Sequence, residues 1–221
     1  SERAYVHIRD SLLKSGAYVG QKIPHLELGR RLGISQTPLR EALFRLAAEG
    51  LITHENNKGF FLAELSSEEA GEIYEIREII EPDLAKKAAM RTTAAQVKIF
   101  SKILDEYKKL MPETYSKLRL LTDKKFHMEI VKLSGNNTLA QILDKIYNIF
   151  IFKRPTEHLS PTRSQEAYTE HLEILEALKL NDGDKAAQLM RNHIRQQRDF
   201  VLADISSRLH GESMVSLASM K

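Results

Sequence analysis

The chain has 221 residues, enough for one large domain or two small ones with a hydrophobic core. Its 42% hydrophobic and 29% charged residues are typical of a globular protein, and a net charge of +3 does not by itself indicate a nucleic-acid partner. The absence of cysteine excludes disulfides and thiol catalysis. No apolar run reaches about 18 residues and the start does not resemble a signal peptide, so we expect a cytoplasmic protein with no membrane partner.

The first part of the chain shows the spacing of three short helices. Apolar residues between positions 6 and 13 predict the first helix, and the second is expected over His25–Leu32, before a glycine suited to a helix end. Thr37 is expected to cap the third helix, with Pro38 in its first position, where a missing N–H costs nothing.

A β-ribbon is predicted directly after the third helix. Residues 51–54 and 60–63 are the two predicted strands, and the loop between them is rich in residues that tolerate a positive φ. Helix, helix, turn, helix and ribbon is the order of a winged helix-turn-helix. We assign this domain to residues 1–66.

The remainder of the chain is expected to be helical. From Glu68 onward no strand-like alternation persists, and breaks are few: Pro112, Gly135, Pro155, Pro161 and Gly183. We expect about six or seven helices over residues 67–206, so the fold class is mainly α, an N-terminal winged helix-turn-helix with a C-terminal all-α helical bundle. Residues 207–221 lack clear periodicity and are expected to form a disordered tail.

Four side chains of types that metals favour fall in register within the predicted bundle. Asp123 and His127 are four residues apart and share one helix face. His171 and His193 are equidistant from a predicted turn at residues 181–184, so they face each other if the two helices form an antiparallel hairpin. Three imidazoles and one carboxylate suit zinc, nickel or a similar divalent ion. A buried hydrogen-bonded network of the same groups is the alternative.

Motifs in both halves carry a family resemblance. The segment Leu32–Leu43, followed by residues 49–52, resembles GntR-family bacterial transcription regulators. Further segments resemble the FCD-type effector domain of the FadR subfamily, namely residues 73–82, 123–127, 134–136, 170–171 and 193. The resemblance implies a DNA-binding transcription regulator without catalytic activity, a homodimer that acts as a repressor at a palindromic DNA operator.

The resemblance also implies which residues contact DNA. Family members place the third helix in the major groove and the wing in the minor groove. The expected contacts are Ser35, Gln36, Thr37, Arg40, Asn57 and Lys58. Arg40 could pair with guanine, whereas Gln36, which stands where most relatives have arginine, suits adenine. Helix capping by Ser35 and Thr37, and a solvated charge at Arg40, are the alternative roles.

In relatives, residues matching Asp123, His127, His171 and His193 hold a metal at the floor of a cavity, and a small carboxylate binds there. Arg77 matches an arginine that helps to hold such acids, and an ion pair with a neighbouring glutamate is its alternative role. A purely structural metal site is a second possibility, because four protein ligands would close a tetrahedral zinc shell. A metal-dependent hydrolase is the third, although no histidine precedes an aspartate and no nucleophile motif stands out.

Overall fold

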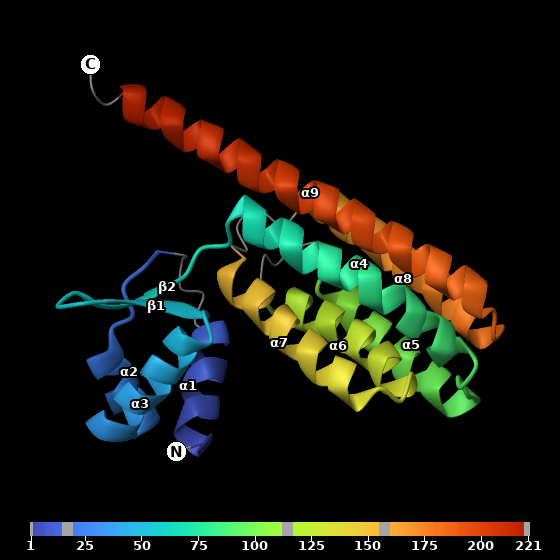
Figure 1. Ribbon diagram of the computed structural model, residues 1–221, viewed down its shortest axis with the longest axis horizontal. Coiled ribbons are helices and arrows are strands. Elements are labelled where there is room, and N and C mark those ends of the chain that lie inside the picture. The colour runs from blue at the N-terminus through green and yellow to red at the C-terminus, as the bar shows by residue number, and fades with distance from the viewer. Residues whose placement is uncertain (1, 15–19, 112–116, 155–159, 219–221) are drawn as a thin grey trace.

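The computed structural model describes four stretches of the chain, residues 2–14, 20–111, 117–154 and 160–218, with side chains as far as residue 208. Pro112 and Pro155, two of the expected breaks, lie outside these stretches. The described residues form nine helices and one two-stranded sheet (Figure 1), and the mainly α fold class is confirmed. Among these residues, no helix combines the length and apolar character needed to cross a membrane.

The N-terminal domain has the predicted order of elements. They are α1 (Glu2–Lys14), α2 (His25–Leu32), α3 (Gln36–Ala48), β1 (Ile52–Glu55) and β2 (Gly59–Leu62). The two strands pair antiparallel, with Ile52 opposite Leu62. Asn57 at the tip has a φ of 64°, the left-handed conformation for which asparagine is suited. The helices enclose a small core in which Ile8, Leu39 and Leu43 are fully buried.

The start of α3 differs from the prediction. Ser35, rather than Thr37, precedes the helix: its backbone is extended (φ −68°, ψ 164°), and Gln36 is already helical. The Ser35 carbonyl accepts a hydrogen bond from the Leu39 amide at 3.2 Å. Pro38 is therefore the third residue of the helix, where its missing N–H still removes no intrahelical bond. Both serine and threonine are favoured caps, so composition alone could not choose between them.

Helices α2 and α3 approach each other closely at Gly29. A Cβ on this residue would lie 2.8 Å from Cδ2 of Leu39 and 3.1 Å from the carbonyl oxygen of Ile34. The turn between the helices begins at Gly33, whose φ of 65° a larger residue would adopt only with strain. These two glycines set the position of α3 relative to α2.

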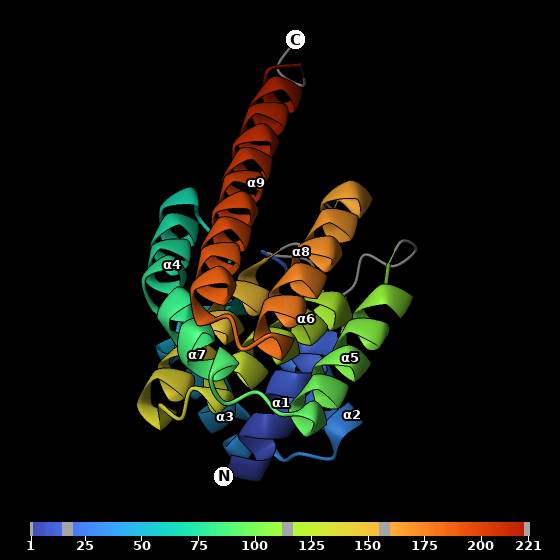
Figure 2. The same ribbon diagram turned by 90° about the vertical axis from the view of Figure 1, so that its right-hand side faces the viewer.

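The C-terminal part is a bundle of six helices in the described residues, within the predicted number. They are α4 (Ser67–Ala89), α5 (Ala94–Lys109), α6 (Lys117–Leu133), α7 (Asn137–Lys153), α8 (Pro161–Lys179) and α9 (Gly183–Ala218). Helix α4 packs along α9, and α8 lies beside α9 (Figures 1 and 2). Helix α6 contacts α4, α5 and α7 and so lies inside the bundle.

Two helix boundaries refine the expected breaks. Pro161 begins α8 rather than interrupting a helix, because Ser160 caps the helix by accepting a hydrogen bond from the Arg163 amide. Helix α9 continues to Ala218, whereas we expected residues 207–221 to lack regular structure. No proline follows Pro161 in the sequence, and the single glycine of this segment costs a helix only about 1 kcal/mol.

The close approach at Gly29 generates a stability prediction. Gly29→Ala should lower the free energy of unfolding by about 1–3 kcal/mol, because the added methyl overlaps Leu39 and a backbone oxygen. Gly71→Ala in α4 is the matched control. No heavy atom lies within 4 Å of a Cβ there, so this change should stabilise the helix by about 1 kcal/mol. Urea unfolding of both full-length variants tests this, and a Gly29→Ala protein as stable as wild type would contradict it.

Candidate metal centre and cavity

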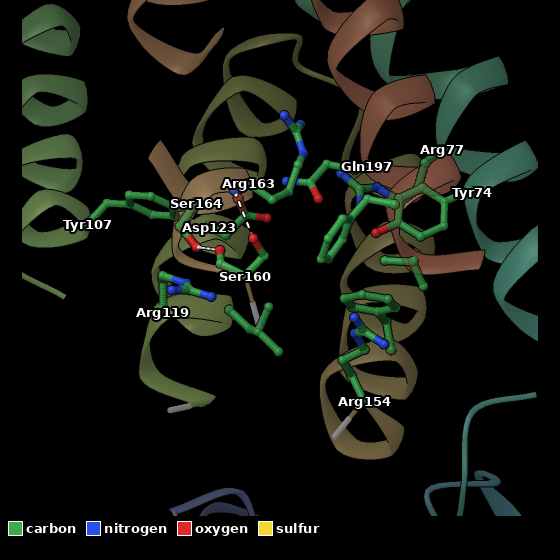
Figure 3. A pocket seen from close by; sticks show the side chains of 14 residues that line it. Tyr74, Arg77, Tyr107, Arg119, Asp123, Arg154, Ser160, Arg163, Ser164 and Gln197 are labelled. Atoms are coloured by element: carbon green, nitrogen blue, oxygen red, sulfur yellow. Dashed lines mark hydrogen bonds between the residues drawn. The ribbon is translucent and has the colours of Figure 1, made fainter. Parts of the chain in front are cut away.

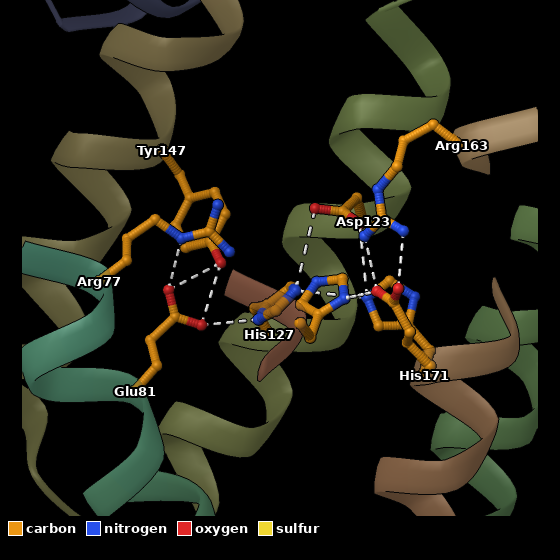
Figure 4. A network of polar contacts seen from close by, with 9 residues as sticks. Arg77, Glu81, Asp123, His127, Tyr147, Arg163 and His171 are labelled. Carbon is orange, nitrogen blue, oxygen red and sulfur yellow. Dashed lines mark hydrogen bonds and ion pairs between the residues drawn. The ribbon is translucent and has the colours of Figure 1, made fainter. Parts of the chain in front are cut away.

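The four predicted metal ligands come together in the C-terminal bundle. Asp123 and His127 project from α6, His171 from α8 and His193 from α9, and one ligand atom from each lies within 4.8 Å of all the others. The Nε2 atom of His171 is 3.3 Å from Nε2 of His127 and 3.5 Å from Oδ1 of Asp123 (Figure 4). The histidines are buried, whereas 18% of the Asp123 side chain is exposed.

The hairpin of α8 and α9 explains why two of these histidines meet. Helix α8 ends at Lys179, Asn181 takes a left-handed conformation with φ 55°, and α9 begins at Gly183. The turn therefore lies where the sequence placed it. The ring centroids of His171 and His193, on the two arms, are 4.6 Å apart.

Two carboxylates orient histidines of the four-residue group Asp123, His127, His171 and His193, which we call the quartet. Glu81 Oε2 lies 2.6 Å from Nδ1 of His127, and Glu170 Oε2 lies 2.5 Å from Nδ1 of His193. When Nδ1 donates to a carboxylate, Nε2 keeps the lone pair that a metal requires. The Nε2 atom of His193 has no hydrogen-bond partner among the described residues. A buried nitrogen without a partner, beside two imidazoles and a carboxylate, fits a divalent ion.

The electrostatics of the site favour the neutral form of His171 and His193 and the charged form of Glu81 and Glu170. Burial and the neighbouring imidazoles lower the pKa of His171 well below its usual range, and burial also lowers that of His193. Burial by itself would raise the pKa of Glu81, but Arg77 and His127 bring it down to about 2. Burial likewise opposes the hydrogen bonds that lower the pKa of Glu170 to about 2. Neutral imidazoles are the form that binds a metal.

Each orienting carboxylate is held in turn by an arginine. Arg77 Nε donates to Glu81 at 2.7 Å, and Tyr147 donates to the same carboxylate at 3.0 Å. Arg163 donates two hydrogen bonds of 2.6 Å to the two oxygens of Glu170. The structure thus contains two Arg–Glu–His chains that end at the quartet.

The glutamates of these chains were not predicted as site residues. An ion pair with a neighbouring glutamate was the alternative role of Arg77 in the sequence analysis, and the structure contains such a pair with Glu81. Glu170 is next to a predicted ligand in the sequence but supports a histidine on a different helix. No local pattern could have identified that partner.

A cavity of about 50 Å³ opens beside Asp123 of the quartet (Figure 3). Among the described residues, its charged lining consists of four arginines and one carboxylate, namely Arg77, Arg119, Arg154, Arg163 and Asp123. Buried Nη2 of Arg77 and Nε of Arg163 have no hydrogen-bond partner among the described residues. Arg77 therefore forms an ion pair with a glutamate and also keeps one buried donor without a partner among the described residues.

The six residues expected to contact DNA are all exposed. Ser35 precedes α3, and Gln36, Thr37 and Arg40 lie in its first turns, while Asn57 and Lys58 form the tip of the ribbon. The Arg40 guanidinium lies 5.9 Å from the ring centroid of Phe44. Lys58 pairs with Glu55 at 2.8 Å, but both side chains are exposed, so the pair contributes little stability.

Comparisons with known proteins give a consistent result for both parts of the chain. Residues 1–62 match the bacterial regulatory proteins of the gntR family, and residues 72–196 match the FCD domain. The Nta operon transcriptional regulator of Aminobacter aminovorans is 32% identical over 183 residues, 83% of this chain and 85% of that protein. The HTH-type transcriptional repressor GlaR of Escherichia coli K12 is 27% identical, over 86% of this chain and 90% of its own. The structure of E. coli McbR/YncC superposes with a TM-score of 0.75 at 18% identity, covering 91% of this chain and 96% of that one, and so shares the fold.

The Arg163–Glu170–His193 chain generates a prediction about metal affinity. Glu170→Gln should weaken zinc or nickel binding about 10- to 100-fold, because the uncharged amide no longer fixes His193 with Nε2 free. Glu166→Gln is the matched control. Glu166 pairs with the same arginine at 3.2 Å but is 57% exposed, and it makes no hydrogen bond to a histidine among the described residues. Competition with a chromophoric chelator measures the affinities, and equal affinities of the two variants would contradict the role of Glu170.

Proposed function

Because the chain belongs to the gntR family of bacterial regulatory proteins and carries the FCD domain of the FadR subfamily, we propose that it is a ligand-responsive regulator. It is a transcription regulator and not an enzyme. In the proposal, a divalent metal and a small organic acid in the C-terminal bundle control DNA affinity in the cytoplasm. The proposal rests on the position of Asp123, which belongs to the quartet and also lines the arginine-rich cavity.

The proposed DNA-reading surface consists of the exposed residues at the start of α3 and at the tip of the ribbon. Ser35, Gln36 and Thr37 lie at the positive end of the helix dipole, where backbone N–H groups favour phosphate. Arg40 has the planar donor fork that matches guanine, and Lys58 offers a point charge to the backbone. Asn57 adopts the positive φ that lets the ribbon turn tightly into the minor groove.

The proposed assembly is a homodimer on a palindromic operator. Winged helix-turn-helix domains commonly read two-fold symmetric half-sites in pairs, which a two-fold dimer matches. Ile76 and Ile79 of α4 are exposed, the latter by 69%, and offer apolar surface to a second copy. A repressor role is supported by the repressor GlaR among the relatives.

The proposed metal is zinc or nickel, held by Asp123, His127, His171 and His193. Such an ion supplies a concentrated positive charge beside the cavity, which attracts an acid. Arg77 is the proposed second anchor, because its Nη2 is a buried donor without a partner among the described residues. Its Nε holds Glu81 at the same time, so an acid on Arg77 also touches the chain that orients His127. A closed, purely structural zinc site is the competing proposal, and the screen of carboxylate ligands described below distinguishes the two.

The DNA-reading proposal predicts different effects for two side chains. Arg40→Ala should cost about 1–3 kcal/mol of binding and relax the preference at one base step. Lys58→Ala should weaken binding to all sequences similarly and flatten its salt dependence. Arg45→Ala is the control on the same helix, since Arg45 pairs with Glu2 and Glu49 instead. Selection from random oligonucleotides followed by titration measures these effects, and failure to enrich any palindrome would sink the proposal.

The acid-sensor proposal predicts binding that needs both metal and Arg77. A screen of small carboxylates by thermal shift should find ligands that stabilise metal-loaded protein, and Arg77→Ala should weaken the best of them about 10- to 100-fold. The same ligand should change operator affinity, and operator should change ligand affinity by the same factor, typically about 5- to 150-fold.

Arg195→Gln is the control for a lost guanidinium, because Arg195 pairs with Glu78 between α9 and α4 and is not a lining residue of the cavity. Metal content of each variant is measured by elemental analysis. The acid-sensor proposal would be overturned if the best ligand were uncharged, or if it bound equally well without metal and without Arg77. The purely structural metal site would then be the remaining proposal.

A further inference from the structure

We propose that the cavity takes a small organic dianion, whose second acidic group binds Arg154 at the side away from the metal quartet. This proposal rests on the acid site above and narrows its ligand class. It derives from a guanidinium that is buried, lines the cavity and uses only part of its hydrogen-bonding capacity.

Arg154 follows the last turn of α7 and has no exposed surface. Its side chain is part of the cavity lining. Figure 3 shows Arg154 and Asp123 well apart, on different sides of the cavity. A ligand held by the metal end therefore reaches Arg154 only through a second group some distance along its length.

Of the three guanidinium nitrogens of Arg154, only Nη1 has a hydrogen-bond partner among the described residues. Nη1 donates to Asp204 Oδ2 at 2.6 Å, whereas Nε and Nη2 are buried with no hydrogen-bond partner among the described residues. These two atoms form one edge of the guanidinium plane, the edge that binds both oxygens of a carboxylate or phosphate in parallel. Buried donors left unpaired are costly to the folded state. An acidic group at this edge would accept hydrogen bonds from both Nε and Nη2.

The charge around Arg154 also favours an anion. Asp204 is shared, since Nε of Arg208 lies 3.5 Å from the same Oδ2 atom. One carboxylate thus faces two guanidiniums, and the second acidic partner of Arg208, Glu64, is 64% exposed and 3.7 Å away. Among the described residues, a surplus of buried positive charge remains at this side of the cavity.

The uncharged part of the lining suits the segment between two acidic groups. Leu120, Phe150 and Val201 contribute apolar surface to the same cavity. A short methylene chain would contact such surface favourably, whereas a highly hydroxylated chain would lose its hydrogen bonds to water there. The ligand class is therefore a short-chain acid with a terminal carboxylate as its second group.

The test uses full-length, zinc-loaded protein and calorimetric titration. The probes are the straight-chain diacids from malonate to adipate, each compared with the monoacid of the same carbon number. One diacid length should bind at least about tenfold more tightly than its monoacid, because it gains a charge-assisted contact with Arg154. Arg154→Gln should remove that advantage and leave monoacid affinity unchanged. Metal content before and after titration shows that the diacids do not extract the zinc.

Arg208→Gln is the matched control, because Arg208 shares Asp204 but is not a lining residue of the cavity, and this variant should keep the diacid preference. Arg154→Lys retains the charge without the paired donors and should show an intermediate preference. The dianion proposal would be overturned if diacids bound no more tightly than monoacids, or if Arg154→Gln weakened the binding of diacids and monoacids equally. Either result would leave the proposed acid site intact. Absence of metal-dependent binding by either class would overturn the acid site itself.

Discussion

The C-terminal bundle depends on the burial of three imidazoles at one point. Each imidazole has two ring nitrogens, and a buried nitrogen without a partner is costly where water does not reach. Glu81 and Glu170 satisfy the Nδ1 atoms of His127 and His193. Buried carboxylates need cations in turn, and Arg77 and Arg163 supply them. Two of the arginines that line the cavity, Arg77 and Arg163, are therefore a consequence of the histidines, and they join the quartet to the cavity in one polar network.

Helix α6 connects this network to the DNA-binding domain. It carries Asp123 and His127 toward the quartet, and it also contacts α1. Between the two domains lies a cleft that Leu13 of α1 and Leu121 and Met128 of α6 help to line. An incompletely filled junction allows small rotations more readily than a close-packed core does. A displacement of α6 at the quartet would thus be transmitted to α1 directly, because the two helices are in contact.

Much of this arrangement could be predicted because it is local in the sequence. The quartet follows from the i, i+4 spacing of Asp123 and His127 and from the equal distances of two histidines to a turn, and both features are set within one helix or one hairpin. The carboxylates that support the quartet could not be found in that way. Glu170 supports a histidine across the α8–α9 hairpin, and Arg154 reaches the cavity from the end of α7. Such pairings depend on how separate helices dock, which periodicity does not specify.

The arginine lining is not explained by the stability of the fold. Buried ion pairs contribute little net stability, and apolar residues of similar volume are often equal or better in their place. Arg77, Arg154 and Arg163 each retain at least one buried donor with no hydrogen-bond partner among the described residues. Unmet donors of this kind destabilise the bundle, and an anion that meets them removes the penalty. The energy lost by the free protein is regained on binding, so a ligand of the right charge and length would stabilise the bundle more than its contact area alone suggests.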